Sequence, residues 1–154
     1  MLKIRFSANI LPLSWVVRAW CLSKVSHVEF VFDDRITILP AIGLNRTVMT
    51  LSRPYTWNWE FVLNFTQSEE KIIREWCESQ IGVPYDYTAL APLNILIPRK
   101  KKYWHDSSCW TCSEFCAYAF HLIGRGLFDL SQNKITPEDL FKKIKSSNFA
   151  KEVN

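Results

Sequence analysis

The sequence has no long hydrophobic segment. No stretch of its 154 residues is an uninterrupted apolar run of the roughly 20 residues that a helix needs to cross a bilayer. The nearest candidate covers residues 10–17, which follow Lys3 and Arg5 as the apolar part of a signal peptide would. However, Arg18 interrupts this run and no cleavage site of small residues follows it. We therefore expect no signal peptide, no stable membrane insertion and a cytoplasmic location.

The sequence also lacks the cysteine pattern of a secreted disulfide framework. Its five cysteines are odd in number and clustered, at Cys21, Cys77, Cys109, Cys112 and Cys116. Such a pattern favours reduced thiols in a cytoplasm.

A strong excess of one charge is missing too. The formal net charge is +4, and the basic run at residues 99–102 has no second basic cluster to join it. A nucleic-acid surface needs such a cluster, so we expect a solvated loop tip and no nucleic-acid partner. Because no internal repeat or linker divides the chain, we expect one domain, residues 1–145, followed by a frayed tail, residues 146–154.

The order of the hydrophobic patterns indicates an α+β fold. The pattern predicts strands at residues 2–6, 26–32, 36–42, 47–51 and 57–65, and helices at residues 12–22, 66–80, 112–123 and 137–144. Residues 85–97 are expected to form a short helix or a packed loop, and residues 98–108 the least ordered stretch. Strands that come first and helices that mostly follow are typical of an antiparallel sheet packed against helices.

The helix predicted at residues 112–123 carries the best candidate for chemistry. Thr111, followed three positions later by Glu114 and then by an apolar run, is the signature of a capping box, which makes Cys112 the first helical residue. The unpaired N–H groups and the positive dipole end at this position favour a thiolate, so we expect a lowered pKa and a nucleophile. The same pattern also fits a small, inert core cysteine.

A histidine and a carboxylate share one face of the strand predicted at residues 26–32. Alternation places His27 and Glu29 together, and it places Val28 and Phe30 on the apolar face, which we expect to meet the core. A helix-capped cysteine and a histidine distant in sequence are the components of Cys–His catalysis, in which the imidazole accepts the thiol proton.

Four short motifs follow one another along the chain. They are SHVEFVF at residues 26–32, IGVPYDY at residues 81–87, CSEF at residues 112–115 and ITPEDL at residues 135–140. In this order they resemble the circularly permuted branch of the NlpC-type cysteine hydrolases, the YiiX-like, papain-like proteins of bacteria and phages. The resemblance implies a permuted papain-like fold, in which the histidine strand precedes the cysteine helix and the nucleophile stands at a helix N-terminus.

The resemblance also implies roles for individual residues. Cys112 would be the nucleophile, His27 the general base, and no cofactor would take part. Tyr85 would line the cleft near the oxyanion, and we place Trp110 and Ser113 in the same substrate-binding region.

The third, orienting residue of the site departs from the family's pattern. These proteins usually place a polar residue on the strand that follows the histidine strand, where this sequence offers only Thr37. Glu29 is our substitute for it.

Our preferred function is a cysteine peptidase or amidase that forms a thioester acyl-enzyme on a peptide or amide substrate. Two alternatives keep the fold: a lipid acyltransferase or phospholipase that acts on an acyl chain, and a binding module whose cysteine is inert. A zinc site is a third alternative, because the sequence holds potential ligands close together, at His105, Cys109, Cys112, Cys116 and His121. Since these residues contain only one CxxC pair, we expect no metal.

Overall fold

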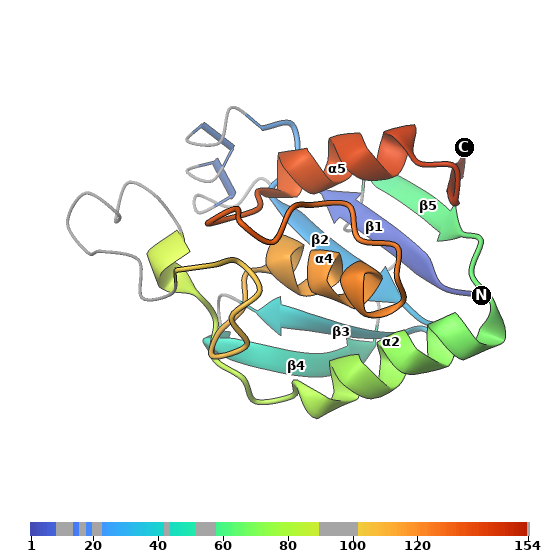
Figure 1. The fold of residues 1–154 in the computed structure, drawn as a ribbon, viewed down its shortest axis with the longest axis horizontal. Coiled ribbons are helices and arrows are strands. Elements are labelled where there is room, and N and C mark those ends of the chain that lie inside the picture. Colours follow the sequence, from blue (N-terminus) through green and yellow to red (C-terminus); the bar gives the residue numbers. More distant parts are fainter. Residues whose placement is uncertain are drawn as a thin grey trace.

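The structure is a computed structural model, which describes residues 1–8, 14–15, 18–19, 23–41, 44–51, 58–89 and 102–153. In these ranges the strands form one six-stranded antiparallel sheet, in the order β4-β3-β2-β1-β5-β6 (Figure 1). The strands are β1 (Lys3–Ser7), β2 (His27–Val31), β3 (Ile36–Ala41), β4 (Arg46–Leu51), β5 (Trp59–Leu63) and β6 (Ala150–Val153). The prediction of an α+β fold with an antiparallel sheet is confirmed.

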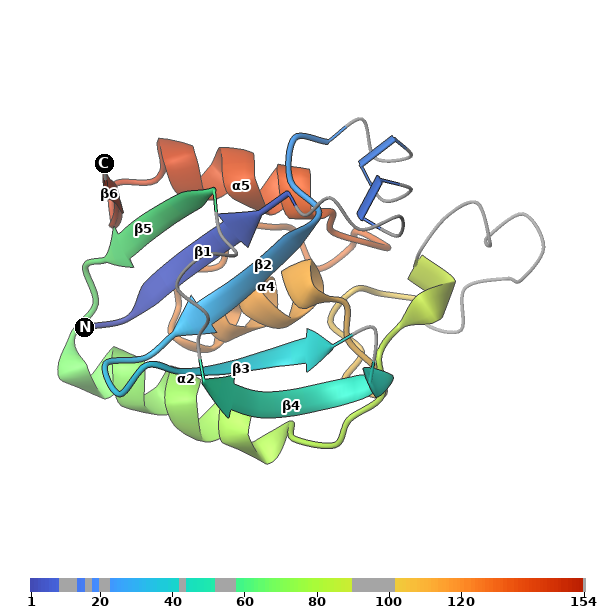
Figure 2. The same ribbon diagram turned by 180° about the vertical axis from the view of Figure 1, so that it is seen from behind.

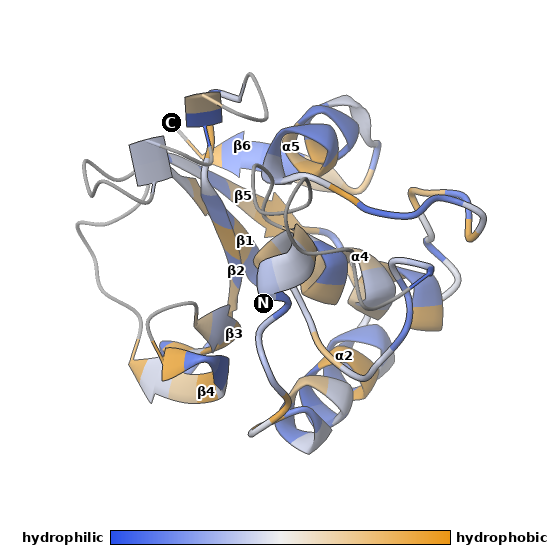
Figure 3. Cartoon of the chain, turned by 90° about the vertical axis from the view of Figure 1, so that its left-hand side faces the viewer, coloured by the Kyte–Doolittle hydropathy of each residue, from blue (hydrophilic) through white to orange (hydrophobic). Residues whose placement is uncertain are grey.

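Three helices lie on one face of the sheet, as Figures 1 and 3 show. They are α2 (Gln67–Ser79), α4 (Cys112–Leu122) and α5 (Pro137–Ser146), and a short 3-10 helix, η2 (Tyr87–Ala89), lies between the first two in sequence. Each of the three follows a threonine N-cap whose side chain accepts a backbone N–H three residues later, at Thr66, Thr111 and Thr136. The local capping signals therefore predicted where these helices begin.

Aromatic contacts identify the face of the sheet that the helices cover, here called the inner face. Phe30 of β2 meets Phe120 of α4 with ring centroids 5.5 Å apart, and Phe6 of β1 meets Phe141 of α5 at 5.2 Å. Because side chains alternate along a strand, the even-numbered residues of β1 and β2 point inward. Val28 belongs to this set and is fully buried.

The opposite, outer face of the sheet is polar where β1, β2 and β5 run side by side (Figure 2). The carboxylate of Glu60 on β5 binds the ammonium of Lys3 at 2.8 Å and the guanidinium of Arg5. Arg5 is also the register partner of Glu29 on β2. The odd-numbered residues of these two strands, His27 included, therefore belong to the outer face.

The end of the chain differs from the expected frayed tail. Residues Ala150–Val153 form β6, which pairs with β5 along its whole length. Just before it, the buried ring of Phe149 lies 5.5 Å from Phe65 and 5.8 Å from Phe120, centroid to centroid. One buried ring and main-chain pairing hold this segment, and neither leaves a periodic signal in so short a sequence.

The remaining predictions of local structure agree with the described ranges. Of the helix predicted at residues 12–22, the described residues 14–15 and 18–19 are helical. Its other residues lie outside the described ranges, as do residue 57 of the predicted strand and residues 90–101. None of the helices in the described part of the chain combines the length and the apolar character that crossing a bilayer requires.

Candidate active site around Cys112

Cys112 occupies the first position of α4, where the sequence placed it. Thr111 has the extended backbone of an N-cap, and its Oγ1 accepts the N–H of Glu114 at 3.3 Å. The helix behind Cys112 is buried on most sides, with Phe115 and Phe120 fully enclosed. The cysteine is therefore held on a rigid support at the end of the helix where backbone N–H groups are unpaired.

The environment of the Cys112 thiol favours its neutral form, contrary to our expectation of a lowered pKa. Only 3% of the residue is exposed, and this burial raises the pKa of the thiol to about 11. Backbone hydrogen bonds from Val28, Ser113 and Cys112 itself lower the pKa, while the neighbouring carboxylate of Glu114 raises it further. Loss of hydration at the sulfur outweighs the helix terminus.

A small cavity of about 40 Å³ opens beside Cys112. It lies between the starts of α4 and α5, where residues 111–113 and 134–137 form its walls, and Ser26, Tyr85 and Ala89 complete the lining. This cavity is a space from which a substrate atom could approach Cys112. Three of these lining residues, Cys112, Ser113 and Tyr85, were predicted for the site.

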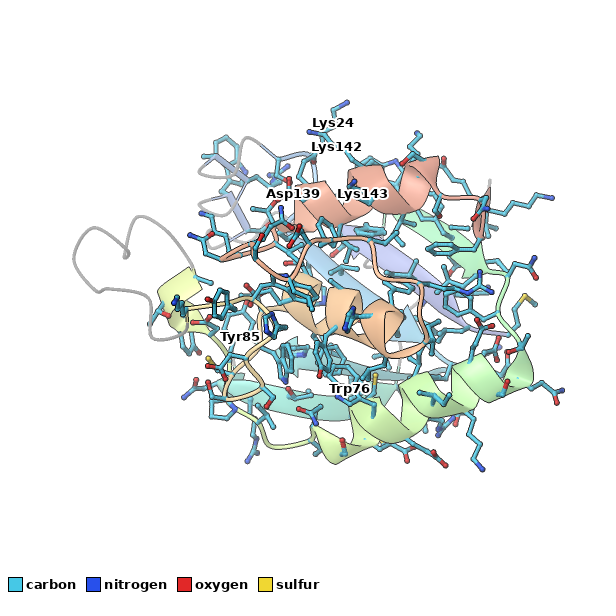
Figure 4. All side chains as sticks on the ribbon, in the orientation of Figure 1. Lys24, Trp76, Tyr85, Asp139, Lys142 and Lys143 are labelled. Carbon is cyan, nitrogen blue, oxygen red and sulfur yellow. The ribbon has the colours of Figure 1, made fainter. Side chains whose placement is uncertain are left out.

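Tyr85 is positioned by the segment that runs beside the start of α4 (Figure 4). Its backbone forms a parallel bridge with Trp110, and its N–H donates to the carbonyl of Asn45 at 3.2 Å. Burial raises the pKa of the Tyr85 phenol well above its ordinary value, and the charge of a Cys112 thiolate would raise it further. The phenol is thus a neutral hydrogen-bond donor close to the sulfur.

The side chains of Ser113 and Trp110 are both engaged in hydrogen bonds within the protein. The hydroxyl of Ser113 donates to the carbonyl of Ile135 at 2.6 Å, which ties the start of α4 to the segment before α5. The indole of Trp110 is fully buried, donates to Gln80 at 3.0 Å and packs against Trp76 at 5.6 Å, so it lies in the core and outside the cavity lining.

His27 and Glu29 lie together on the outer face, away from the cavity. The imidazole Nε2 is 4.0 Å from a carboxylate oxygen of Glu29. Burial lowers the pKa of His27 to about 4. Burial also raises the pKa of Glu29, against the opposing effects of the Arg5 charge and a hydrogen bond with Thr37. Within the described ranges, no hydrogen bond or ion pair joins His27 to Cys112.

The cavity-lining residue just before β2 is Ser26, which was not among the site residues predicted from the sequence. It shares the parity of Val28 and Phe30, and this is the signal that could have placed it on the inner side. The N–H of Ser26 donates to the carbonyl of Ser7 at 2.9 Å, while the register partner of Ser7 is His27. Two residues of one strand thus oppose one residue of the other, as in a β-bulge, which locally changes side-chain direction.

The order and packing of these elements are those that the resemblance to the YiiX-like proteins implies. A histidine-bearing strand comes early in the chain, and a buried helix that begins with cysteine comes late and packs on that strand.

Comparison with solved structures agrees with this assignment. The chain matches the crystal structure of YiiX from Escherichia coli O157:H7 with a TM-score of 0.70 and 12% sequence identity, over 99% of this chain and 94% of that chain. The YiiX-like fold expected from the motifs is therefore confirmed. No protein-family model matches the chain, and no curated protein sequence matches it.

The YiiX structure is described as that of a metalloprotein. In the part of this chain that the structure describes, no group of three or more His, Cys, Asp or Glu side chains is placed to hold a metal ion. Cys112 and Cys116 stand one turn apart on a buried helix, and burial raises the pKa of both thiols. A zinc site needs converging, deprotonated ligands, so the described residues do not fit one.

Proposed function

We propose that the protein is a papain-like cysteine hydrolase that cleaves an amide bond through a thioester on Cys112. The observation that carries the proposal is the placement of this sulfur. It stands at the first residue of a buried helix, under hydrogen bonds from Val28 and Ser113, on the wall of a cavity that Tyr85 also lines. This arrangement offers a rigid nucleophile, one open side and donors for a developing oxyanion.

In the proposed reaction, the sulfur of Cys112 attacks the substrate carbonyl carbon while the thiol proton passes to a base. The electrons of the carbonyl double bond move to its oxygen, which accepts hydrogen bonds from the start of α4 and from the Tyr85 hydroxyl. Collapse of this intermediate expels the amine, which takes the proton from the base and leaves a thioester. Water, deprotonated by the same base, then hydrolyses the thioester and restores the thiol.

His27 is the proposed base, and this role requires its ring to turn toward the cavity. The bulge formed by Ser26 and His27 against Ser7 lies at the place where such a turn would occur. A pKa of about 4 leaves the imidazole unprotonated at neutral pH, as a proton acceptor must be. Glu29, 4.0 Å away, remains the proposed orienting partner in the resting arrangement.

A catalytically inert binding module is the second candidate. The neutral, buried thiol of Cys112 and the outward position of His27 favour it. In that case Cys112 is a core residue, and no reaction is catalysed in the cavity.

Alkylation by iodoacetamide with peptide mapping separates the two candidates. Cys109 is a matched internal control because it is also buried: 8% of its surface is exposed, compared with 3% for Cys112. The hydrolase predicts that Cys112 reacts faster than Cys109 at pH 8 despite its lower exposure, and that His27→Ala slows Cys112 alone. Equal or slower reaction of Cys112, unchanged in His27→Ala, would establish the inert module. Peptide and phospholipid substrates offered side by side then distinguish an amidase from an acyltransferase.

A further inference from the structure

The cavity beside Cys112 contains a single formal charge. Of its ten lining residues in the described ranges, only Lys134 carries a charged side chain. The others present hydroxyl groups, the thiol, the phenol of Tyr85 or apolar surface. A cavity with one cation and no anion has a definite preference for the charge of what enters it.

Lys134 has no ionic partner among the described residues, whereas the acidic side chains near it are engaged. Asp139 accepts the N–H of Thr136 at 3.0 Å and its hydroxyl at 2.6 Å, which completes the capping box of α5. Glu138 binds the ammonium of Lys142 at 3.5 Å and accepts the backbone N–H of Lys24 at 2.9 Å. The ammonium of Lys134 is thus left to interact with water or with a ligand.

Further cations lie along α5, outside the lining of the cavity. Lys142 and Lys143 lie on the later turns of this helix and Lys24 lies near Lys142 (Figure 4), while the backbone N–H of Lys24 donates to Glu138. Exposed cations attract anions to a molecule by long-range steering, an effect that salt weakens.

We infer that Lys134 is a specificity-determining residue, which binds a negatively charged group, a carboxylate or a phosphate, of the acyl donor that reacts at Cys112. The inference rests on the proposed function. Lys134 lies two residues before Thr136, on the segment whose Ile135 carbonyl is tied to Ser113, so its position relative to the nucleophile is fixed through one hydrogen bond. An anionic group held there would place the adjoining carbonyl next to the sulfur.

Two alkylating reagents that differ in charge test this without knowledge of the substrate. The rate of Cys112 alkylation is measured with anionic iodoacetate and with neutral iodoacetamide, in wild type, Lys134→Gln, Lys134→Arg and Lys151→Gln. Lys151→Gln, on β6, removes the same charge from the opposite side of the molecule. We expect the ratio of the alkylation rate with iodoacetate to the rate with iodoacetamide to fall roughly twofold to fivefold in Lys134→Gln, the range for a partly exposed charge pair. In Lys134→Arg and Lys151→Gln this ratio should keep its wild-type value.

The outcomes separate the two hypotheses. If Cys112 reacts with both reagents and Lys134→Gln does not change the ratio of the two rates, the role of Lys134 is overturned. The role of Cys112 as the nucleophile would not be affected by that result. If neither reagent modifies Cys112, the proposed function is overturned and this inference with it. Protection of Cys112 from iodoacetamide by acetate, at constant ionic strength, assigns a carboxylate, and protection by inorganic phosphate assigns a phosphate. Lys134→Gln should abolish whichever protection occurs.

Discussion

Placing a histidine at position 26 should create the Cys–His contact that the resting structure lacks. Ser26 lines the cavity with Cys112, whereas His27 lies on the outer face beside Glu29. At pH 6 an introduced imidazole with an ordinary pKa of about 6.5 is mostly protonated, whereas a thiol with a pKa of about 11 is only about 0.001% ionised. A positive charge within a few ångströms lowers the pKa of an acid by roughly 1 to 3. Alkylation of Cys112 at pH 6 should therefore be roughly tenfold faster or more in Ser26→His than in wild type.

The assay is the pH dependence of iodoacetamide labelling, followed by peptide mapping at Cys112 and Cys109. Ser26→Asn is the matched control, because it loses the same hydroxyl contacts and adds a polar side chain that is not a base. The serine is only partly buried, so the larger ring can extend toward solvent. An unchanged rate in a Ser26→His protein with the thermal stability of Ser26→Asn would refute the inward placement of position 26.

Two further predictions concern stability. Hydrogen bonds from Arg125 and from Thr66 hold the pKa of Glu69 at about 2. The stabilisation from this carboxylate is complete above its unfolded pKa of 4.5 and is lost as the pH falls toward 2. The melting temperature of Arg125→Gln should therefore decrease less than that of wild type as the pH falls from 4.5 toward 2. A decrease as large as in wild type would contradict this prediction. Phe149→Ala should cost about 3 kcal/mol in urea denaturation, because it empties a buried ring position at the start of β6. A loss below about 1 kcal/mol would show that the C-terminal segment contributes little to the fold.

The features that local chemistry determines could be predicted from the sequence. A threonine N-cap fixes a helix start by local hydrogen bonding, so α2, α4 and α5 begin where the pattern placed them. The acid three residues later completes a capping box in α2 and α5, whereas α4 has only the bond to the threonine side chain. Alternation along residues 26–32 likewise separated the face of Phe30 from the face of His27.

The features that depend on packing could not be predicted in this way. The pKa of Cys112 depends on the water removed when α4 packs against the sheet, and no local pattern measures that loss. The indole of Trp110 lies in the core because Gln80 and Trp76, distant in sequence, receive it there. Lys134 joins the cavity only through the fold, since 22 residues separate it from Cys112.

The alternation that predicted the two faces of β2 also limits how His27 could ever reach Cys112. Sliding the whole strand by one residue would bring His27 inward, but it would also expose Val28 and Phe30, which are fully buried. Exposing each of these side chains costs about 1.5–3 kcal/mol, and Glu29 would enter the core at the same time. A change confined to the bulge at Ser26 and His27 leaves Val28 and Phe30 in place. If His27 is the base, its movement must therefore be local to the first residues of β2, and the rest of the sheet must stay as it is.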